Sequence, residues 1–245
     1  MKAGLIGYGK MGKILETTLR KRGHEIVSVT DPFESCGISS APEKADVLVE
    51  FTRPDTALLN IVLAASLGKP IVVGTTGWHE KLAEASAAVE SGGASLLWAA
   101  NFSLGVNLFY RIAAYAASVM DPFDEYDVAG YEVHHNKKAD SPSGTAETLV
   151  KRVLSSMNRK KKVLWDSPRE KMAPDTMHYA SLRVGSVPGI HSLVFDSPAD
   201  TIEISHSARN REGLAAGAVL AAEWLVAEKR RGVFTMDDVL KDILG

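Results

Sequence analysis

The chain has 245 residues, 45% of them apolar and 24% charged, and its 28 Lys and Arg against 30 Asp and Glu leave a net charge of −2. This near-average composition, with no apolar run of the roughly 18 residues that a membrane span needs, excludes a disordered, collagen-like or membrane-embedded chain, and the charge balance argues against a strongly basic nucleic-acid binder. Cys36 is the only cysteine, so no intramolecular disulfide can form, and a reducing, cytoplasmic location is favoured.

The first hundred residues alternate between short β-branched runs and helical stretches. In the first helical stretch, Met11, Ile14, Leu15 and Leu19 fall on one face of a helix. Strands are expected at residues 4–7, 25–30, 47–52, 71–74 and 95–99, with a second helix at 55–67. This alternation predicts a doubly wound parallel sheet with helices on both faces, over residues 1–104.

The middle of the chain follows a different pattern, because successive strand candidates there have no helix between them. Helices are expected at residues 106–120 and 144–157, and strands at 126–134, 179–184, 191–195 and 201–206. Such a run predicts a second, α+β domain with an open mixed or antiparallel sheet over residues 105–212. A helix rich in Ala and Leu, at residues 213–228, begins the last segment, 213–245.

A glycine-rich turn joins the first expected strand to the first helix. Residues 7–12, Gly-Tyr-Gly-Lys-Met-Gly, fit the pattern G-x-G-x-x-G. Gly7 allows the tight turn, Gly9 lets the backbone approach a pyrophosphate, and Gly12 lets the helix pack close to the strand. The phosphates would then meet free N–H groups and the positive end of the helix. We therefore predict a Rossmann-like dinucleotide-binding domain; the alternative is a glycine-rich turn that holds no ligand.

An acidic residue ends the second expected strand and bears on the choice of dinucleotide. Asp31 lies where a carboxylate can bind the adenosine-ribose hydroxyls and would repel a 2′-phosphate. Neither Pro32 nor Phe33 can pair with such a phosphate. We therefore expect NADH to be at least tolerated. Lys10, Lys13 and Arg53 could still attract the extra phosphate, so NADPH stays open.

Two further loops follow expected strands, at residues 74–77 and 99–102. In an open parallel sheet, ligands lie at the carboxyl ends of the strands, and small residues with free amides there suit the ribose and carboxamide of a nicotinamide. Each loop alone is equally typical of an ordinary β–α turn. The expected cofactor contacts are Gly7, Tyr8, Gly9, Lys10, Met11, Gly12, Asp31, Gly74, Thr75, Thr76, Ala99, Ala100, Asn101 and Phe102.

The most informative stretch is residues 132–145, Glu-Val-His-His-Asn-Lys-Lys-Ala-Asp-Ser-Pro-Ser-Gly-Thr. Ser143 is a candidate N-cap, so the amides beyond it would point into an anion site. Histidine can donate a proton near neutral pH and lysine adds positive charge, which suits a small carboxylate substrate that receives a proton. His134 and His135 can share a pocket only if the strand ends or bends there. The alternative is a polar surface loop before a capped helix.

Taken together, these motifs resemble the 4-hydroxy-tetrahydrodipicolinate reductase family, also called dihydrodipicolinate reductases, of the bacterial and plant route to diaminopimelate and lysine. The resemblance covers nearly the whole chain and is most specific in the pattern His-His-x-x-Lys-x-Asp-x-Pro-Ser-Gly-Thr. In the family, the glycine-rich loop is often a residue longer, and Arg often stands where this chain has Asn136. The matching segments are residues 7–12, 51–54, 74–77, 100–103, 105–107, 134–145 and 234–240.

The resemblance implies an NAD(P)H-dependent reduction of 4-hydroxy-tetrahydrodipicolinate to tetrahydrodipicolinate, by way of dehydration to a conjugated cyclic imine. It implies that His134 and Lys138 are the proton-donating catalytic residues. It assigns the substrate contacts to His135, Ser143, Gly144 and Thr145. It further implies a homotetramer built through the second domain, and a C-terminal segment that returns to the first domain. Arg211 lies in a stretch that can reach the cofactor in relatives.

Two other functions stay open: another small-molecule NAD(P) oxidoreductase, such as an amino-acid dehydrogenase, and a dinucleotide-sensing protein without chemistry. The Pro-Ser-Gly-Thr helix start argues against the first, and the intact His134 and Lys138 argue against the second. The basic run Arg-Lys-Lys-Lys at residues 159–162 is interpreted as a solvated helix end, and His191 and His206 as structural residues. Apart from the dicarboxylate substrate and the dinucleotide, we expect no metal, nucleic acid or membrane partner.

Overall fold

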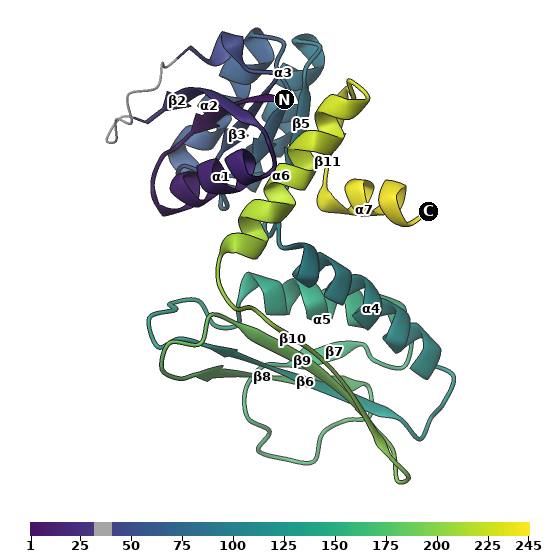
Figure 1. Ribbon diagram of the computed structural model, residues 1–245. Coiled ribbons are helices and arrows are strands. Elements are labelled where there is room, and N and C mark those ends of the chain that lie inside the picture. The colour runs from purple at the N-terminus through teal and green to yellow at the C-terminus, as the bar shows by residue number, and fades with distance from the viewer. Residues whose placement is uncertain (32–40) are drawn as a thin grey trace. The chain divides into compact units, whose positions relative to one another are not determined.

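The computed structural model describes residues 1–31 and 41–245 (Figure 1). The chain divides into two units, which are described separately below. Unit 1 comprises Met1–Leu104 and Arg211–Gly245, and unit 2 comprises Gly105–Asn210. Pro32, Phe33 and Cys36, on which two of the expectations above depend, lie outside the described residues.

Unit 1 is built on a six-stranded sheet in which every pair of neighbouring strands is parallel. The order of the strands is β11-β5-β4-β3-β1-β2. Their bounds are β1 Lys2–Ile6, β2 Glu25–Thr30, β3 Val47–Glu50, β4 Ile71–Val73, β5 Ser95–Trp98 and β11 Gly232–Phe234. The five strands expected before residue 104 are all present, and the doubly wound sheet is confirmed.

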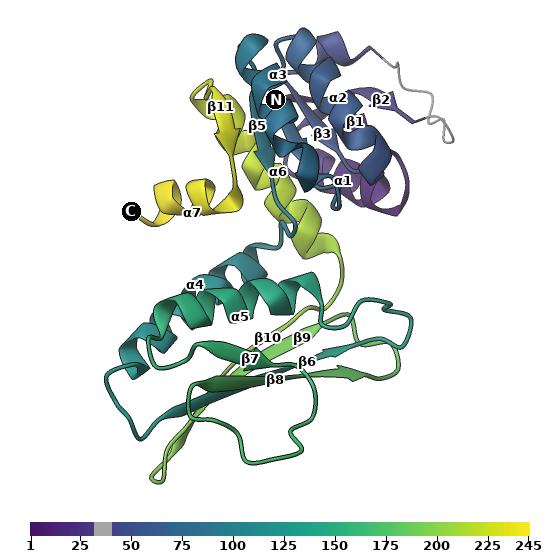
Figure 2. The same cartoon turned by 180° about the vertical axis from the view of Figure 1, so that it is seen from behind.

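Helices cover both faces of this sheet (Figures 1 and 2). Successive residues of a buried parallel strand point to opposite faces, so both must be apolar. Val49 accordingly joins a core cluster with α1, α6 and α7, whereas Leu48 joins a second cluster with α2 and α3. The bounds are α1 Lys10–Lys21, α2 Pro54–Ser66, α3 Leu82–Ser91, α6 Glu212–Ala227 and α7 Met236–Leu244.

The C-terminal segment belongs to unit 1 through both a helix and a strand. The α6 residues Ala218, Ala222 and Leu225 are fully buried in the first core cluster. The helix was expected from the sequence, but β11, which pairs in parallel with β5 and forms one edge of the sheet, was not. A three-residue strand is too short to show a period in the sequence, and its partner is far away along the chain.

Unit 2 is a five-stranded mixed sheet with helices on one face. The strand order is β10-β9-β6-β8-β7; the pairs β6–β8 and β8–β7 are parallel, and β6–β9 and β9–β10 are antiparallel. In both views α4 and α5 lie on the same side of the sheet (Figures 1 and 2). The bounds are β6 Asp127–His134, β7 Lys162–Leu164, β8 Thr176–Arg183, β9 Ile190–Asp196, β10 Thr201–Ser207, α4 Leu104–Met120 and α5 Gly144–Ser156. The open mixed sheet is as expected, except that β7 is an addition.

The basic run at residues 159–162 corrects one expectation. Lys160 is only 3% exposed, and its Nζ donates hydrogen bonds to the carbonyl oxygens of Pro174 and Thr176, at 2.7 and 3.2 Å. Arg159 donates to the carbonyl oxygen of Tyr126 at 2.8 Å. Buried carbonyl groups need donors, and long cationic side chains provide them here. Lys160 and Arg159 therefore hold neighbouring loops of unit 2 in place through hydrogen bonds. The interpretation of the run as a solvated helix end is wrong for Lys160.

Candidate functional site

The glycine-rich loop of unit 1 has the close contacts that its pattern predicts. Gly7 has a φ of +91°, and a Cβ there would lie 2.3 Å from the carbonyl oxygen of Phe51. A Cβ on Gly12 would lie 2.4 Å from the carbonyl oxygen of Gly7, so α1 packs directly on the turn. Gly9 differs, because a Cβ there would meet nothing within 4 Å. The first and third glycines thus serve the fold, whereas the second leaves open space above the backbone.

The start of α1 fits the phosphates of a dinucleotide. Gly9 is the N-cap residue, and no side chain hydrogen bond caps the helix. The first N–H groups of α1 can therefore bind an anion, with the helix dipole in support. Asp31 follows β2 and accepts a hydrogen bond from the backbone N–H of Tyr8 at 2.6 Å, which places its carboxylate beside the loop. These residues fit a dinucleotide with a free adenosine ribose.

A buried carboxyl group, not foreseen from the sequence, joins the loops that follow β3 and β4 at the carboxyl edge of this sheet. Glu50 is fully buried at the end of β3. Its Oε1 accepts hydrogen bonds from the hydroxyl of Thr75 at 3.0 Å and from the side chains of Thr52 and Asn60. Burial raises the pKa of Glu50, although these hydrogen bonds oppose the shift. Glu50 therefore fixes the loops after β3 and β4, one of which carries expected cofactor contacts.

The expected cofactor residues differ in how they face the solvent. Gly9, Lys10, Thr76 and Ala100 are exposed, and Asn101 is half-buried. The side chains of Thr75 and Phe102 point into the protein: Thr75 is 6% exposed and bonded to Glu50, and Phe102 is 1% exposed in the first core cluster. Any contact of those two residues with a cofactor must therefore come from their backbone.

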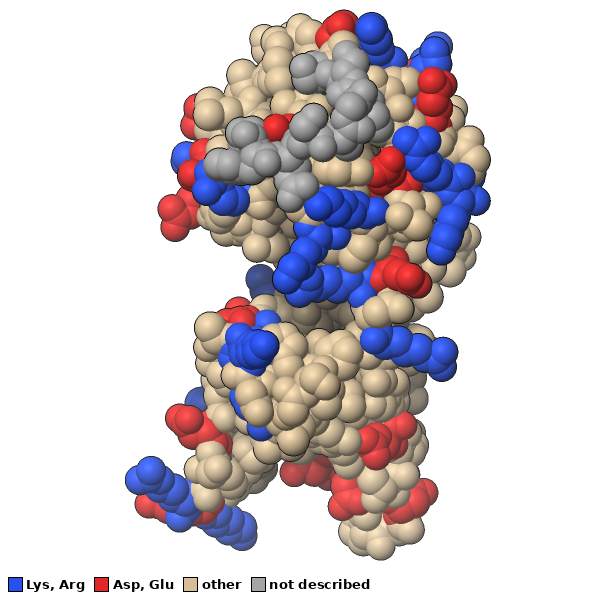
Figure 3. Space-filling view, turned by 60° about the vertical axis from the view of Figure 1, so that its left-hand side comes forward, with Lys and Arg blue, Asp and Glu red and all other residues tan. Residues whose placement is uncertain are grey.

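Positive charge is available around the unit 1 loops. Figure 3 shows several Lys and Arg side chains close together on the surface of unit 1. Lys10, Lys13 and Arg53 are exposed residues of the first turn, the first helix and the loop after β3. Positive side chains close to the start of α1 would attract a pyrophosphate. The same side chains could also attract a 2′-phosphate, so they do not decide between NADH and NADPH.

In unit 2, the residues of the His-His motif lie between the end of β6 and the start of α5. The strand ends at His134, so His135 is free of the alternation that would otherwise turn it to the opposite face. Ser143 is the N-cap of α5: its Oγ accepts a hydrogen bond from the N–H of Ala146 at 3.1 Å. Gly144 is exposed at the first position of the helix, and Thr145 is half-buried beside it. The helix start is therefore capped and open to solvent, as an anion site there would require.

A buried carboxylate lies at the centre of this arrangement. Glu132 is fully buried, and its Oε1 accepts hydrogen bonds from the N–H of Ser143 at 3.1 Å and from the Arg183 guanidinium at 3.2 Å. The hydroxyl of Ser181 donates to the same oxygen at 2.9 Å. The other oxygen, Oε2, accepts a hydrogen bond from the Ser143 hydroxyl and lies 3.3 Å from Nδ1 of His134.

The charges in this cluster shift its ionisation. Burial by itself would raise the pKa of Glu132, but the hydrogen bonds from Ser143 and Ser181 outweigh it and lower the pKa, with help from His134. Burial lowers the pKa of His134; Glu132 opposes this shift, and Lys138 and Arg183 reinforce it. The cluster therefore holds an ionised carboxylate against an imidazole that releases its proton more readily than usual.

A second buried histidine adjoins the same carboxylate. His191 is 3% exposed, its ring lies 5.2 Å from that of His134, and its Nδ1 is 3.2 Å from the hydroxyl of Tyr179. Burial lowers its pKa to about 4, so it is neutral at neutral pH. Ligand atoms of Glu132, His134 and His191 lie within 4.8 Å of one another, a spacing that a metal ion could use, but both oxygens of Glu132 already accept hydrogen bonds.

The second catalytic candidate, Lys138, is partly exposed near the same motif. Its Nζ lies 2.8 Å from Oδ1 and 2.9 Å from Oδ2 of Asp140. Both residues come from the loop between β6 and α5, which also contains the cis peptide bond before Pro142. The hydrogen bond from Lys138 lowers the pKa of Asp140, so the carboxylate of Asp140 is ionised beside it.

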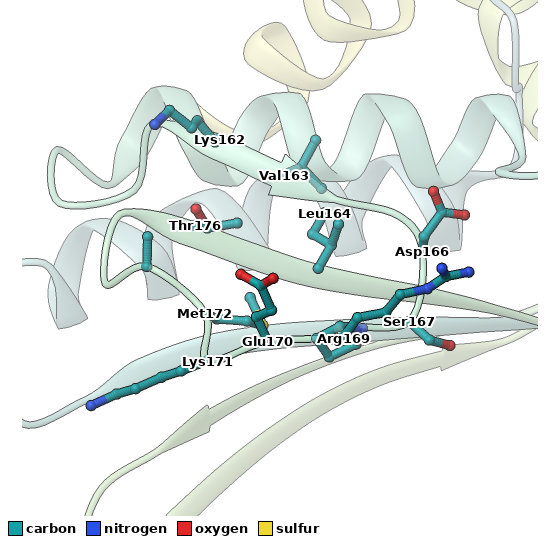
Figure 4. A pocket seen from close by; sticks show the side chains of 12 residues that line it. Lys162, Val163, Leu164, Asp166, Ser167, Arg169, Glu170, Lys171, Met172 and Thr176 are labelled. Atoms are coloured by element: carbon teal, nitrogen blue, oxygen red, sulfur yellow. The ribbon is translucent and has the colours of Figure 1, made fainter.

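Two hollows of the surface are lined by residues outside the candidate sites. One, of about 820 Å³, lies along the connection between β7 and β8 in unit 2 and is lined by side chains of both charges (Figure 4). Another, of about 280 Å³, lies in unit 1 near Lys69 and Arg231. Neither is lined by a residue of the two candidate sites.

Comparison with known proteins bears on both units. The family model described as dihydrodipicolinate reductase, N-terminus, matches residues 1–102, and the model described as dihydrodipicolinate reductase, C-terminus, matches residues 105–240. A relative named 4-hydroxy-tetrahydrodipicolinate reductase, from Christiangramia forsetii, is 38% identical over 99% of both chains. Another of that name, from Chromobacterium violaceum, is 34% identical over 95% of both chains.

Solved structures agree on the fold. Dipicolinate-bound dihydrodipicolinate reductase from Paenisporosarcina sp. TG-14 has a TM-score of 0.77 at 22% identity, covering 96% of this chain and 97% of that one. Amine dehydrogenase from Mycobacterium smegmatis has a TM-score of 0.62 at 12% identity, covering 95% and 94%. At these identities the likeness concerns the fold alone. Among the described residues, no helix combines the length and apolarity needed to cross a bilayer.

Proposed function

The chain belongs to the dihydrodipicolinate reductase family, and on that premise we propose how its two units divide the work of the reaction. Family models cover both units and named relatives are 34–38% identical, so the resemblance read from the motifs is confirmed. The enzyme is an NAD(P)H-dependent oxidoreductase of diaminopimelate and lysine biosynthesis, and it reduces 4-hydroxy-tetrahydrodipicolinate. Which residues carry each step is the proposal that follows.

Unit 1 binds the dinucleotide. The uncapped N-terminus of α1 and the open space above Gly9 receive the pyrophosphate, and Asp31 accepts hydrogen bonds from the adenosine-ribose hydroxyls. The loops that hydrogen-bond to Glu50 present backbone groups to the nicotinamide ribose and the pyridine ring. When bound, the reduced nicotinamide supplies the hydride.

Unit 2 binds the substrate and supplies the proton. The N–H groups of Gly144 and Thr145, at the start of a helix capped by Ser143, hold a substrate carboxylate, and His135 contacts the substrate. Negative charge develops on the conjugated ring as it is reduced, and an acid must protonate the neighbouring carbon. His134 or Lys138 supplies this proton; both lie on the segment that leads into the helix.

One observation carries this assignment above the rest: the same buried carboxylate, Glu132, contacts the ring of His134 and caps the N-terminus of α5. A polar surface loop before an ordinary helix would have no reason to bury a carboxylate and bind both parts to it, since burial of a charge is costly. An acid and an anion site held in one geometry are what proton transfer to a carboxylate substrate requires.

The experiment is NADH oxidation on addition of the product of dihydrodipicolinate synthase, with the wild-type chain and single variants. We expect His134→Gln or Lys138→Ala to lower turnover by about 10²–10⁴, the usual worth of a general acid. Lys137→Ala, an exposed neighbour on the same loop, is the matched control and should stay near wild type. Near-normal turnover by both folded catalytic variants would show that neither side chain takes part in the chemistry. If the wild-type chain did not oxidise NADH with this substrate, the proposed reaction itself would be refuted.

For the cofactor, we propose that NADH is accepted, because a carboxylate at Asp31 suits a free ribose. Steady-state kinetics with NADH and with NADPH test this directly. A chain that turns over with NADPH alone would contradict the role given to Asp31.

We also propose that the enzyme is a homotetramer assembled through unit 2. The helices cover one face of its sheet, and on the other face Leu182 of β8 is 54% exposed, an apolar side chain that a second copy would cover. Light scattering of the purified chain measures its mass in solution, and a monomer would refute the assembly. The sequence favours a cytoplasmic location, which fractionation of cells producing the chain would test.

A further inference from the structure

We propose that Glu132 is the positioning residue of unit 2: it holds the His134 ring and the N-terminus of α5 in one geometry and favours the protonated imidazole. This inference rests on the proposed function, in which His134 acts as an acid. It goes further, because it assigns the control of that acid to a residue that makes no contact with substrate.

The contacts of Glu132 come from three separate parts of unit 2. Its neighbour on the same strand is His134, Ser143 belongs to the start of α5, and Ser181 and Arg183 belong to β8. A fully buried carboxylate that accepts this many hydrogen bonds cannot move without leaving donors unsatisfied, which is costly in the interior of a protein. The positions of the acid and of the anion site are therefore coupled through one side chain.

Among the charged groups around His134, Glu132 has the main part in stabilising the protonated ring. From the other elements, the ring is faced by Lys138 and Asp140 of the loop and by Arg183 of β8. Lys138 and Asp140 are paired with each other, and Arg183 disfavours the imidazolium. Glu132 is thus the buried anion that favours the charged ring.

His191 of β9 also faces His134, and it contributes no charge. Its Nδ1 lies 3.2 Å from the hydroxyl of Tyr179. Burial lowers the pKa of His191 to about 4, so the ring is neutral near neutral pH. Of the two nitrogens of His134, Nδ1 faces Glu132 at 3.3 Å, which leaves Nε2 to deliver a proton.

Glu132→Gln keeps the shape of the side chain and removes its charge, so the proton affinity of His134 falls. A rate that depends on protonated His134 declines as pH rises through the pKa of this residue, and in the variant that decline moves to lower pH. We expect kcat/KM near neutral pH to fall about ten- to a hundredfold, less than on loss of the acid itself. The defect should shrink as the pH is lowered, because both proteins then carry a protonated ring.

The experiment measures kcat/KM against pH for the wild type, Glu132→Gln, Glu132→Asp and a matched control, Glu203→Gln, an exposed glutamate on the same sheet that bonds to Tyr131. Glu132→Asp keeps the charge and should keep the wild-type pH profile even if its rate falls. A defect in Glu132→Gln that is constant with pH, or no defect, overturns the proposal. If Glu132→Gln does not fold, Arg183→Gln decides, because loss of that cation should move the decline to higher pH; an unmoved profile overturns the proposal.

A second readout separates this inference from the proposed function. The His134 imidazole can be titrated by NMR in the chain without substrate, with His134→Gln identifying its signals. We expect its pKa to fall in Glu132→Gln and to stay in place in Glu203→Gln, whatever the rate of reaction. Normal turnover by His134→Gln would end the role of His134 as the acid, whereas an unshifted titration in Glu132→Gln would end the role given to Glu132.

Discussion

Two glycines of the same loop should respond in opposite ways to the same substitution. Gly9→Ala should leave the free protein as stable as the wild type and weaken NADH binding about ten- to a hundredfold. Gly12→Ala should destabilise the protein even without cofactor. The reason is steric: a Cβ on Gly9 meets nothing within 4 Å, whereas a Cβ on Gly12 lies 2.4 Å from the carbonyl oxygen of Gly7.

The magnitudes follow from these contacts. At Gly9 the backbone is extended, with φ of −69°, so alanine fits; a slightly poorer N-cap is offset by the lower entropy of the unfolded chain, each about 0.5 kcal/mol. In the complex, a methyl group would displace the pyrophosphate from one charge-assisted hydrogen bond, about 1.5–3 kcal/mol, and each 1.4 kcal/mol is tenfold in affinity. At Gly12 the backbone clash costs about 1–3 kcal/mol in the free protein.

The assay pairs thermal unfolding without cofactor with NADH affinity measured by fluorescence titration. Gly213→Ala, in the first turn of α6, is the control for stability, because a Cβ there has an ordinary 3.5 Å contact, with the hydroxyl of Ser103. It should leave the stability unchanged or raise it slightly. Wild-type NADH affinity in a folded Gly9→Ala protein would refute the placement of the pyrophosphate over this loop.

Three further predictions follow from single contacts. Burial lowers the pKa of His191 from 6.5 to about 4, so the unfolded chain binds the extra proton before the folded chain does. The free energy of unfolding of unit 2 should therefore decrease by up to about 3 kcal/mol as the pH falls from 6.5 to 4. In denaturant titrations, the free energy of unfolding of His191→Gln should depend less steeply on pH, and a slope equal to that of the wild type would contradict this prediction. Asp31→Asn removes the charge that repels a 2′-phosphate, so the kcat/KM ratio of NADPH to NADH should rise about tenfold or more, and an unchanged ratio would exclude Asp31 from the ribose site. Gly189→Ala places a Cβ 3.0 Å from Nε2 of His134 and should lower kcat without changing NADH affinity; wild-type kcat would show that the ring has room to move.

The fold of unit 1 could be predicted because its signals are local. The glycine-rich loop combines positions whose roles are set within a few residues, and the alternation of strands and helices repeats every few tens of residues. The strand β2 was expected with its observed bounds, Glu25–Thr30. The exception, β11, is three residues long and owes its structure to pairing with β5. Tertiary pairing of this kind leaves no period in the sequence.

The site in unit 2 could be predicted only in part, for the same reason. The motif residues from His134 to Thr145 are contiguous, so their grouping was visible before the structure. Arg183 and His191 come from β8 and β9, and no local pattern marks them as neighbours of the motif. His191 was interpreted as a structural residue, and its buried place beside Glu132 was not foreseen. Glu132 itself lay inside the motif and was overlooked, because burial is invisible in a single sequence.

The two buried glutamates differ in the direction of their pKa shifts. Glu50 and Glu132 each end or nearly end a central strand, are fully buried, and gather hydrogen bonds from neighbouring loops. Among the described residues, no cation pairs with Glu50, and burial raises its pKa. Glu132 has Arg183 and His134 beside it, and its pKa is lowered.

A buried acid without a cation is suited to holding backbone loops, since either of its protonation states can accept the hydrogen bonds of Thr52 and Thr75. A buried acid kept ionised can also act on a titrating neighbour, and only Glu132 has one, at 3.3 Å. The difference predicts that Glu50→Gln changes cofactor affinity without moving the pH profile, whereas Glu132→Gln moves the profile. If both substitutions moved it equally, burial itself would be the cause, and the pairing of Glu132 with His134 would have no special part in the reaction.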